Sequence, residues 1–313
     1  MTKKILAIDG GGIRGIIPAL ILTEIEKRTG KHIFQMFDMI AGTSTGGILT
    51  CGLSCPEMYS ALSLSKLYIN EGHNIFNKSF KYSLSSLFGF FGPKYTGDGL
   101  KTVLKKYFGE YKLSQSSVDI LVTSYEIQSR ESFFFKSWKA KQDVREDFAL
   151  NDVAQATASG PVYFPPTRID YPKPNESAST TYHCLALVDG GVCANNPAMC
   201  AYVEALKHYN TEDVLVVSLG TGSNAHPLDY QKVEHWGAKD WLTNVLNIFE
   251  SAGDSVNYEL SQILDDDKYY RLQMPCDVEM DDISKIPDLQ IVASKYIQEN
   301  SNTIDKICKL IVV

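Results

Sequence analysis

The segment Gly42-Thr43-Ser44-Thr45-Gly46 places one serine among small residues, in the pattern G-x-S-x-G. A nucleophilic serine must stand on a sharp turn between a strand and a helix, where glycines two residues before and after it prevent clashes. The apolar run DMIA precedes the segment and GGILTCGL continues from it, which is the context that this turn requires. The pattern predicts nucleophilic catalysis by Ser44. A glycine-rich turn in which Ser44 only caps a helix is the structural alternative.

A serine hydroxyl is a weak nucleophile unless a base takes its proton. In the order Ser, acid, His, the base is a histidine late in the chain, which here is His226 or His235. A carboxylate can serve instead when partial burial raises its pKa towards the working pH. Asp189 is the strongest carboxylate candidate, because it ends the apolar run CLALVD and is followed by Gly190 and Gly191. Asp-Gly is also a common turn dipeptide, so a purely structural turn is the alternative.

A second glycine-rich segment, DGGGIRG, follows the apolar run that opens the chain. Its spacing, Gly10-x-Gly12-x-x-Gly15, matches the phosphate loop of dinucleotide folds, which need an acidic residue about 20 positions later, at the end of the next strand. Asp38 begins that strand rather than ending it. Backbone N–H groups beside a nucleophile on the neighbouring strand instead suit the oxyanion of an acyl transfer. A nucleotide-dependent enzyme remains a competing interpretation.

The elements that must carry these loops alternate along the chain. Strands are expected at residues 4–9, 38–41, 118–125, 131–138, 184–191, 213–222 and 268–274, and helices at 13–28, 56–70, 99–108, 147–159, 197–209, 239–263 and 288–310. This alternation predicts an α/β protein with parallel strands. No linker-like segment separates the elements, so we expect a single domain over 1–313, with the motifs in about 4–222 and a helical part at 223–313.

The composition narrows the functional classes. The net charge of −7 disfavours nucleic-acid binding, which needs clustered Lys and Arg. An acidic protein also lacks attraction to an anionic membrane, so any lipid contact would be apolar and local. The seven cysteines form no CxxC pair or Cys/His cluster, so we expect no metal site and reduced, cytoplasmic thiols. We also expect neither a signal peptide nor a membrane span, because no run of about 20 apolar residues occurs.

Residues 75–95 are aromatic, punctuated by glycine and without periodicity. Long irregular segments of compact domains are usually lids, binding loops or mobile segments. An enzyme that acts at a lipid surface needs exposed apolar side chains at the mouth of its site. The candidates for such a lipid-access surface are Leu84, Leu87, Phe88, Phe90 and Phe91. The alternative is that these side chains pack beneath the loop as a small separate core.

The three motifs together resemble the patatin-like phospholipase family. DGGGIRG occupies residues 9–15, GTSTG residues 42–46 and DGG residues 189–191, in the order and spacing of that family. FGPKY (91–95), ATASGPVYFPP (156–166) and the continuation VDGGVCANNPA add to the resemblance, which covers about residues 4–222. Gly160-Pro161 departs from the family, many of whose members carry alanines there, and we do not expect this difference to affect the catalytic residues.

The resemblance implies a three-layer α/β/α fold with a mainly parallel central sheet and a Ser–Asp dyad without histidine. Carried over by position, Ser44 is the nucleophile and Asp189 the base. The implied oxyanion hole comprises Gly10, Gly11, Gly12, Ile13, Arg14 and Gly15, the nucleophile turn Gly42, Thr43, Thr45 and Gly46, and the base turn Gly190 and Gly191. Arg14 falls on the family's basic position, where it would hold the oxyanion or a lipid phosphate; a surface charge at a helix start is the alternative.

The implied activity is hydrolysis of acyl esters of phospholipids, lysophospholipids or galactolipids, without a metal or another cofactor. Such an enzyme is expected to be cytoplasmic and to contact membrane surfaces transiently. Two further functions stay open: a serine esterase with a Ser–His–Asp triad, and a non-catalytic lipid-binding or interaction protein of the same fold. The sequence also leaves open the lipid head group, the acyl position, the oligomeric state and any activating partner or effector.

Overall fold

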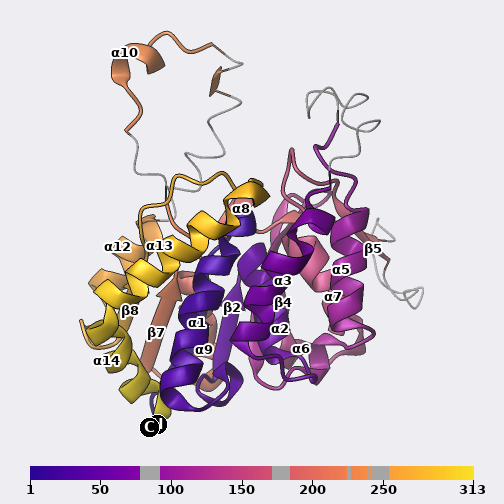
Figure 1. Cartoon of the computed structure of the whole chain (residues 1–313). Helices are drawn as coiled ribbons and strands as arrows, with labels where there is room; N and C mark the ends of the chain where they lie inside the picture. Colours follow the sequence, from indigo (N-terminus) through magenta and orange to yellow (C-terminus); the bar gives the residue numbers. More distant parts are fainter. Residues whose placement is uncertain (78–91, 171–183, 224–226, 238–239, 242–253) are drawn as a thin grey trace.

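A central eight-stranded sheet organises the protein (Figure 1). The computed structural model describes residues 1–77, 92–170, 184–223, 227–237, 240–241 and 254–313. The strands are β1 (Lys3–Ile8), β2 (Met39–Gly42), β3 (Asp119–Glu126), β4 (Glu131–Lys136), β5 (Thr167–Asp170), β6 (Cys184–Asp189), β7 (Val214–Leu219) and β8 (Tyr269–Leu272). Their order is β5-β6-β3-β2-β1-β7-β8, with β4 paired to β3.

The sheet is mixed but mostly parallel. β3, β2, β1, β7 and β8 pair in parallel, while β4 and β6 pair antiparallel with β3, and β5 pairs antiparallel with β6. The predicted α/β class with a mainly parallel sheet is therefore confirmed. Parallel strands joined through helices bring the loops after their carboxyl ends to one edge of the sheet. The loops after β1 and β2, which carry the two glycine-rich motifs, meet at that edge.

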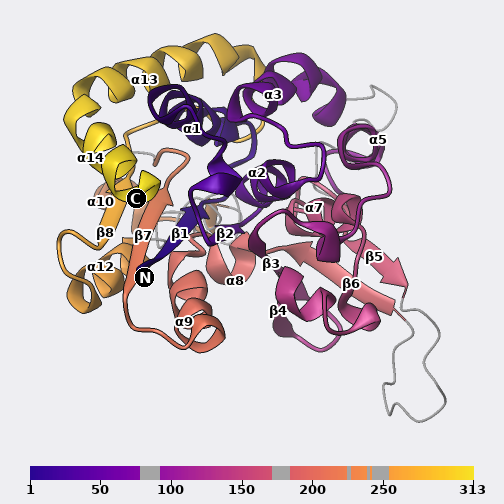
Figure 2. The same ribbon diagram turned by 90° about the horizontal axis from the view of Figure 1, so that it is seen from below.

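Helices cover both faces of the sheet, which gives the predicted three layers (Figure 2). The larger layer consists of α1 (Ile16–Thr29), α2 (Thr45–Ser54), α3 (Ala61–Ile75), α5 (Asp98–Phe108), α7 (Leu150–Thr157), α13 (Ile286–Glu299) and α14 (Ser301–Val312). The opposite layer contains α6 (Ser137–Ala140), α9 (Ala198–Tyr209) and α12 (Asp254–Ile263). The short helices α8 (Gly191–Ala194) and α10 (Tyr230–Val233) belong to connecting segments.

Strand β1 shows why both faces are covered. Leu6 and Ile8 pack into the larger core, and Ile5 and Ala7 into the smaller one, because successive side chains of a strand point to opposite faces. All four side chains are fully buried. A run that is apolar at every position is typical of a strand covered on both sides.

The C-terminal part belongs to the same sheet and core. β8 pairs with β7, with Val216 opposite Tyr269, and α13 and α14 pack against α1. The prediction of a single helix at 288–310 is wrong in one respect, because the structure has two helices there, α13 and α14, which are divided at Asn300. The backbone of Asn300 leaves the helical range (φ −106°, ψ 21°). The side-chain amide of Asn300 donates to the carbonyl of Tyr296 at 3.0 Å. The short strand β5 was not predicted from the sequence.

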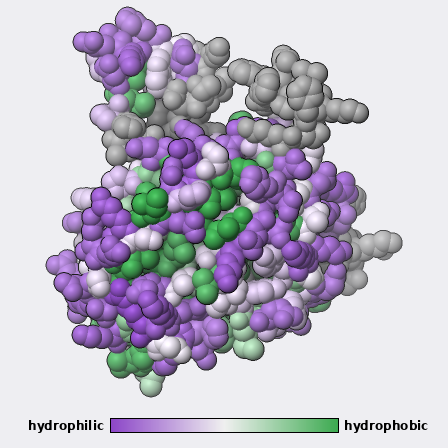
Figure 3. All heavy atoms as spheres, viewed as in Figure 1, coloured by the Kyte–Doolittle hydropathy of each residue, from purple (hydrophilic) through white to green (hydrophobic). Residues whose placement is uncertain are grey.

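No helix in the described residues is both long and apolar enough to cross a bilayer. The face of the molecule shown in Figure 3 is largely hydrophilic, with apolar areas among the hydrophilic side chains.

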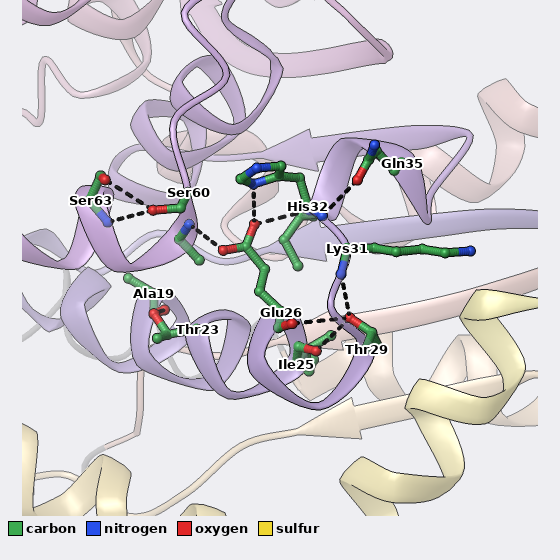
Figure 4. A network of polar contacts seen from close by, with 12 residues as sticks. Ala19, Thr23, Ile25, Glu26, Thr29, Lys31, His32, Gln35, Ser60 and Ser63 are labelled. Carbon is green, nitrogen blue, oxygen red and sulfur yellow. Dashed lines mark hydrogen bonds and ion pairs between the residues drawn. The ribbon is translucent and has the colours of Figure 1, made fainter.

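Glu26 ties three segments together near the end of α1 (Figure 4). One carboxylate oxygen accepts the N–H of Ile33 at 3.1 Å and contacts the ring Nδ1 of His32 at 3.3 Å. The other oxygen accepts the N–H of Ala61, the first residue of α3, at 2.9 Å. The α1 helix ends directly afterwards at Gly30, which has a left-handed backbone (φ 68°). Glu26 therefore fixes α3 relative to α1.

Replacing Glu26 with alanine is expected to lower the free energy of unfolding by about 1.5–3 kcal/mol, because two backbone N–H groups lose a charged acceptor. Glu24→Ala is the matched control on the same helix. The partners of Glu24 are the side chains of Lys27 and Arg28, and such pairs are worth about 1 kcal/mol or less. Urea unfolding of both variants measures the difference. Equal losses would show that the Glu26 contacts contribute no more than a surface ion pair.

Candidate active site

Ser44 occupies a strained turn between β2 and α2. Its φ of 54° and ψ of −122° lie outside the regions that a residue with a side chain normally adopts. Such strain costs about 1–3 kcal/mol and is kept where the surroundings enforce it, typically at functional sites. Here the Ser44 N–H donates to the hydroxyl of Thr157 on α7 at 2.8 Å, and its carbonyl accepts the N–H of Ile48 at 3.0 Å.

Gly42 and Gly46 are required by the packing of this turn. A Cβ on Gly42 would lie 2.2 Å from the carbonyl oxygen of Gly46, and a Cβ on Gly46 would lie 2.1 Å from that of Ile8 in β1. Both distances are far inside van der Waals contact. The glycines thus let the turn fold on itself and against the neighbouring strand, as the G-x-S-x-G pattern predicts.

Thr45 begins α2 and anchors it to α3. Its hydroxyl shares a hydrogen bond of 2.6 Å with the phenol of Tyr68. Burial raises the pKa of Tyr68 far above its usual range, and the hydrogen bond with Thr45 acts in the opposite direction. Tyr68 therefore remains a neutral phenol at any physiological pH.

The glycine-rich loop follows β1, and most of its N–H groups already have acceptors. Gly10 donates to the carbonyl of Asn195 at 3.1 Å, Ile13 to that of Met280 at 2.8 Å, and Arg14 to that of Gly11 at 3.2 Å. In the described part of the chain, no acceptor is found for the N–H of Gly11 or of Gly12, and both residues border the cavity that contains Ser44. Of the six residues that the resemblance assigns to the oxyanion hole, Gly11 and Gly12 are thus the candidates to donate to an oxyanion, and this role stays a prediction.

The conformation of this loop depends on glycine at Gly12, whose φ is 59°. A Cβ there would lie 2.2 Å from the carbonyl oxygen of Met280. Arg14 is only 5% exposed, its Nε donates to the carbonyl of Gly11 at 3.3 Å, and it is not among the residues that line the cavity. Its expected contact with an oxyanion or a lipid phosphate stays a prediction, while the structure gives it a role in bracing the loop.

The start of the loop is fixed by a buried ion pair. Asp9 is bound through both carboxylate oxygens by the guanidinium of Arg271 on β8, at 2.9 and 2.5 Å. Arg271 also donates to the hydroxyl of Ser218 on β7 at 2.9 Å. The side chains of Asp9 and Arg271 are 5% and 10% exposed. The C-terminal part of the chain thus holds the glycine-rich loop at its base.

Asp189 ends β6 and is 9% exposed. One of its carboxylate oxygens accepts the N–H of Gly191 at 2.7 Å, and its own N–H donates to the carbonyl of Ser159 at 3.0 Å. A Cβ on Gly190 would lie 2.1 Å from the hydroxyl of Thr123, so this glycine is needed for the turn to approach β3. The carboxylate is therefore held by the turn that carries it.

Strand β3 brings the two motif turns together. β2 runs parallel to β3 and ends with Gly42 opposite Val122, while β6 runs antiparallel to it and ends with Asp189 opposite Ser124. The two strands therefore end within two positions of each other along β3. Sequence spacing alone does not show this, because β3 itself carries no motif.

Ser44 and Asp189 line one cavity of about 360 Å³, a size typical of small-molecule sites. Its largely apolar wall is formed by Ile48, Tyr68, Ile75, Phe76, Leu100, Ala158, Pro161, Tyr163, Phe164, Val192 and Met280. Among the described residues the Ser44 hydroxyl has no hydrogen-bond partner. Catalytic contacts are often long before substrate binds, and tighten in the complex.

Of the two histidines considered for a triad, His235 lies within the described residues, and it does not line this cavity. No histidine is among its described lining residues. The side chain of His235 is 80% exposed and lies 3.6 Å from its neighbour Glu234. His226 lies outside the described residues, and so do Leu84, Leu87, Phe88, Phe90 and Phe91, for which the lipid-access role stays a prediction.

Three residues at the site were given no role by the sequence: Thr157, Asn195 and Met280. Thr157 and Asn195 lie in stretches that added to the family resemblance, so a weak signal existed for them. Met280 had none, because it lies in the part of the chain without recognised motifs. The next residue, Asp281, fixes the backbone around Met280, because it accepts the Tyr95 hydroxyl at 2.6 Å and pairs with Lys94.

Comparison with known proteins assigns the family. Residues 6–202 match the family model for patatin-like phospholipase. Patatin-like protein 4 of Arabidopsis thaliana is 31% identical over 341 residues, covering 95% of this chain and 83% of that protein. Patatin-03 of Solanum tuberosum is 31% identical over 302 residues, covering 86% and 75%. Among solved structures, VipD from Legionella pneumophila aligns with 95% of this chain and 67% of its own, at 12% identity and a TM-score of 0.44. On the sequence matches, the chain belongs to the patatin-like phospholipase family, whose members are lipid acyl hydrolases.

Proposed function

We propose that this protein hydrolyses fatty-acyl esters of phospholipids, lysophospholipids or related glycerolipids, with Ser44 as nucleophile and Asp189 as base. One observation carries the proposal: the strained Ser44 turn and the Asp189 turn face the same largely apolar cavity. An apolar cavity suits a hydrocarbon chain, because burying each methylene contributes about 0.8 kcal/mol. The described lining residues include no Lys or Arg, so the phosphates of a nucleotide would meet no cationic side chain in this cavity.

The geometry suggests a two-step reaction. The Ser44 hydroxyl attacks the ester carbonyl while Asp189 takes its proton, and the N–H groups of Gly11 and Gly12 receive the oxyanion. Each such donor is typically worth about 2.7–4 kcal/mol. Asp189 returns the proton to the departing alcohol, leaving the acyl group on Ser44. Water then loses a proton to Asp189 and adds to the acyl carbon, and the fatty acid leaves as Ser44 regains its hydrogen.

Transient contact with a lipid surface is part of the proposal. Val192 lines the cavity and is 52% exposed, and Val162, beside the lining residues Pro161 and Tyr163, is 53% exposed. Val162 also has a φ of 74°, rare for a β-branched residue. Exposed apolar side chains beside a site allow shallow insertion among the acyl chains of a membrane. A protein of net charge −7 depends on this insertion, because it is not attracted electrostatically to an anionic membrane.

Two measurements test this function. A fluorophosphonate should label Ser44 covalently, with the modified peptide identified by mass spectrometry. Vesicles of defined phospholipid, lysophospholipid or galactolipid should release free fatty acid, and the chain released identifies the acyl position. Labelling at another residue, or the absence of fatty acid from all three lipid classes, would contradict the proposal.

The Ser–Asp dyad and a Ser–His–Asp triad predict different activities for two histidine variants. We expect His226→Ala and His235→Ala to keep kcat/KM for p-nitrophenyl butyrate within about threefold of wild type, since neither side chain acts as the base. If His226 or His235 were that base, its removal would lower the rate by about 10²–10⁴-fold. Steady-state kinetics of both variants decides between the dyad and the triad.

A further inference from the structure

The side chain of Asn195 is a polar group at the site for which the described residues offer no hydrogen-bond partner. Its backbone carbonyl accepts the N–H of Gly10, which fixes its position at the end of α8. Its side-chain amide borders the cavity. Within the described residues, neither atom of that amide forms a hydrogen bond. The adjacent Asn196 differs, because it is buried and its Oδ1 accepts the N–H of Ala198 at the start of α9.

The Asn195 amide lies close to both reactive side chains. A Cβ placed on Gly10 would be 2.3 Å from Oδ1 of Asn195 and 3.2 Å from Cβ of Ser44. A Cβ placed on Gly191 would be 3.3 Å from the same Oδ1 and 3.1 Å from Oδ1 of Asp189. Oδ1 of Asn195 therefore shares one neighbouring position with Cβ of Ser44 and another with the Asp189 carboxylate.

We propose that Asn195 is a catalytic residue that binds the hydrolytic water of the second half-reaction; this rests on the function proposed above. Water has two O–H bonds. One proton goes to Asp189 as the oxygen adds to the acyl carbon, and the other O–H donates to Oδ1 of Asn195, which orients the oxygen lone pair towards that carbon. The bond between the acyl carbon and the Ser44 oxygen then breaks, and the proton on Asp189 returns to Ser44.

Methanol provides a discriminating probe, because it has a single O–H. When methanol attacks the acyl-enzyme, Asp189 takes that proton and no second O–H needs an acceptor. Loss of the Asn195 amide should therefore slow hydrolysis more than methanolysis. A purely structural role for Asn195 would slow both reactions alike.

The experiment uses Asn195→Ala and Asn195→Leu in the full chain, with p-nitrophenyl butyrate as the substrate. We expect a burst of about one p-nitrophenol per enzyme, at a rate within about threefold of wild type, followed by turnover about 10²-fold slower. In aqueous methanol the ratio of methyl butyrate to butyrate should rise at least about tenfold. The leucine variant retains the side-chain volume, so agreement between the two variants excludes an effect of lost packing.

Asn196→Ala is the matched control. It removes the contact with the start of α9 and should lower the unfolding temperature while leaving the product ratio unchanged. A burst rate that falls as far as turnover, or an unchanged product ratio in the Asn195 variants, would overturn the inference. If wild-type protein is neither labelled at Ser44 nor active, the proposed function itself fails. If wild type is labelled and hydrolyses the ester, failure of the Asn195 variants to behave as expected refutes only the role of Asn195.

Discussion

Ser44→Ala is expected to lower kcat for p-nitrophenyl butyrate by about 10⁴–10⁶-fold, to the residual level left by binding and the oxyanion donors. The reason is direct: the oxygen that forms the acyl-enzyme is removed. Alanine retains the Cβ, and among the described residues the Ser44 hydroxyl has no hydrogen bond to lose. The unfolding temperature should therefore change little.

Asp189→Asn is the companion variant. It should impair transfer of the Ser44 proton, while the oxygen that forms the acyl-enzyme bond is still present. We expect a loss of about 10²–10⁴-fold, because general base catalysis contributes that much. Fluorophosphonate labelling separates the two roles: Ser44→Ala should not be labelled at all, whereas Asp189→Asn should be labelled slowly. Retention of full activity by Ser44→Ala, with the fold intact by circular dichroism, would refute the mechanism.

The second large effect concerns stability. Arg271→Ala is expected to reduce the free energy of unfolding by about 3–5 kcal/mol, because it leaves the buried Asp9 carboxylate without the guanidinium that binds both its oxygens. Two to three such losses would exhaust the stability of an ordinary domain, which is about 5–15 kcal/mol. Activity should also fall in the folded fraction, because Asp9 leads directly into the glycine-rich loop.

Lys268→Ala is the control for this effect. Lys268 precedes β8 and pairs with Asp213 at 2.7 Å, but the two side chains are 32% and 49% exposed. Exposed pairs are worth about 1 kcal/mol or less, so this variant should remain close to wild type. Urea unfolding followed by fluorescence measures both variants. Equal losses for Arg271→Ala and Lys268→Ala would mean that the Asp9 pair does not anchor the site.

The family model ends at residue 202, yet described residues beyond it contact the glycine-rich loop and border the cavity. Met280 accepts the N–H of Ile13 and borders the cavity, and Arg271 holds Asp9. Removing the part of the chain after 222 would therefore expose β7 and release the glycine-rich loop. Apart from the two candidate histidines, no functional residue was predicted in this part, because its contribution consists of single contacts without a recurring motif.

The turn around Ser44 and the order of helices and strands could be predicted from the sequence alone. The glycines at Gly42 and Gly46 are required by contacts within the turn and with the adjacent strand, so the pattern around Ser44 already predicts that turn. Alternating apolar runs predicted the α/β layers for the same reason, since period and turn residues act over a few positions. The one closing helix at 288–310 was wrong because Asn300 ends α13 through its backbone angles, which apolar spacing does not report.

Which of the predicted groups lie together at one cavity could be seen only in the folded chain. The register of β2 and β6 along β3 places the Ser44 and Asp189 turns side by side, although 144 residues separate them in the sequence. Carbonyls of Asn195 and Met280 accept two N–H groups of the loop, while those of Gly11 and Gly12 find no acceptor in the described part of the chain. The physical reason is that strand register and hydrogen-bond partners at long separation depend on the packing of the whole chain, whereas a motif records only the residues next to it.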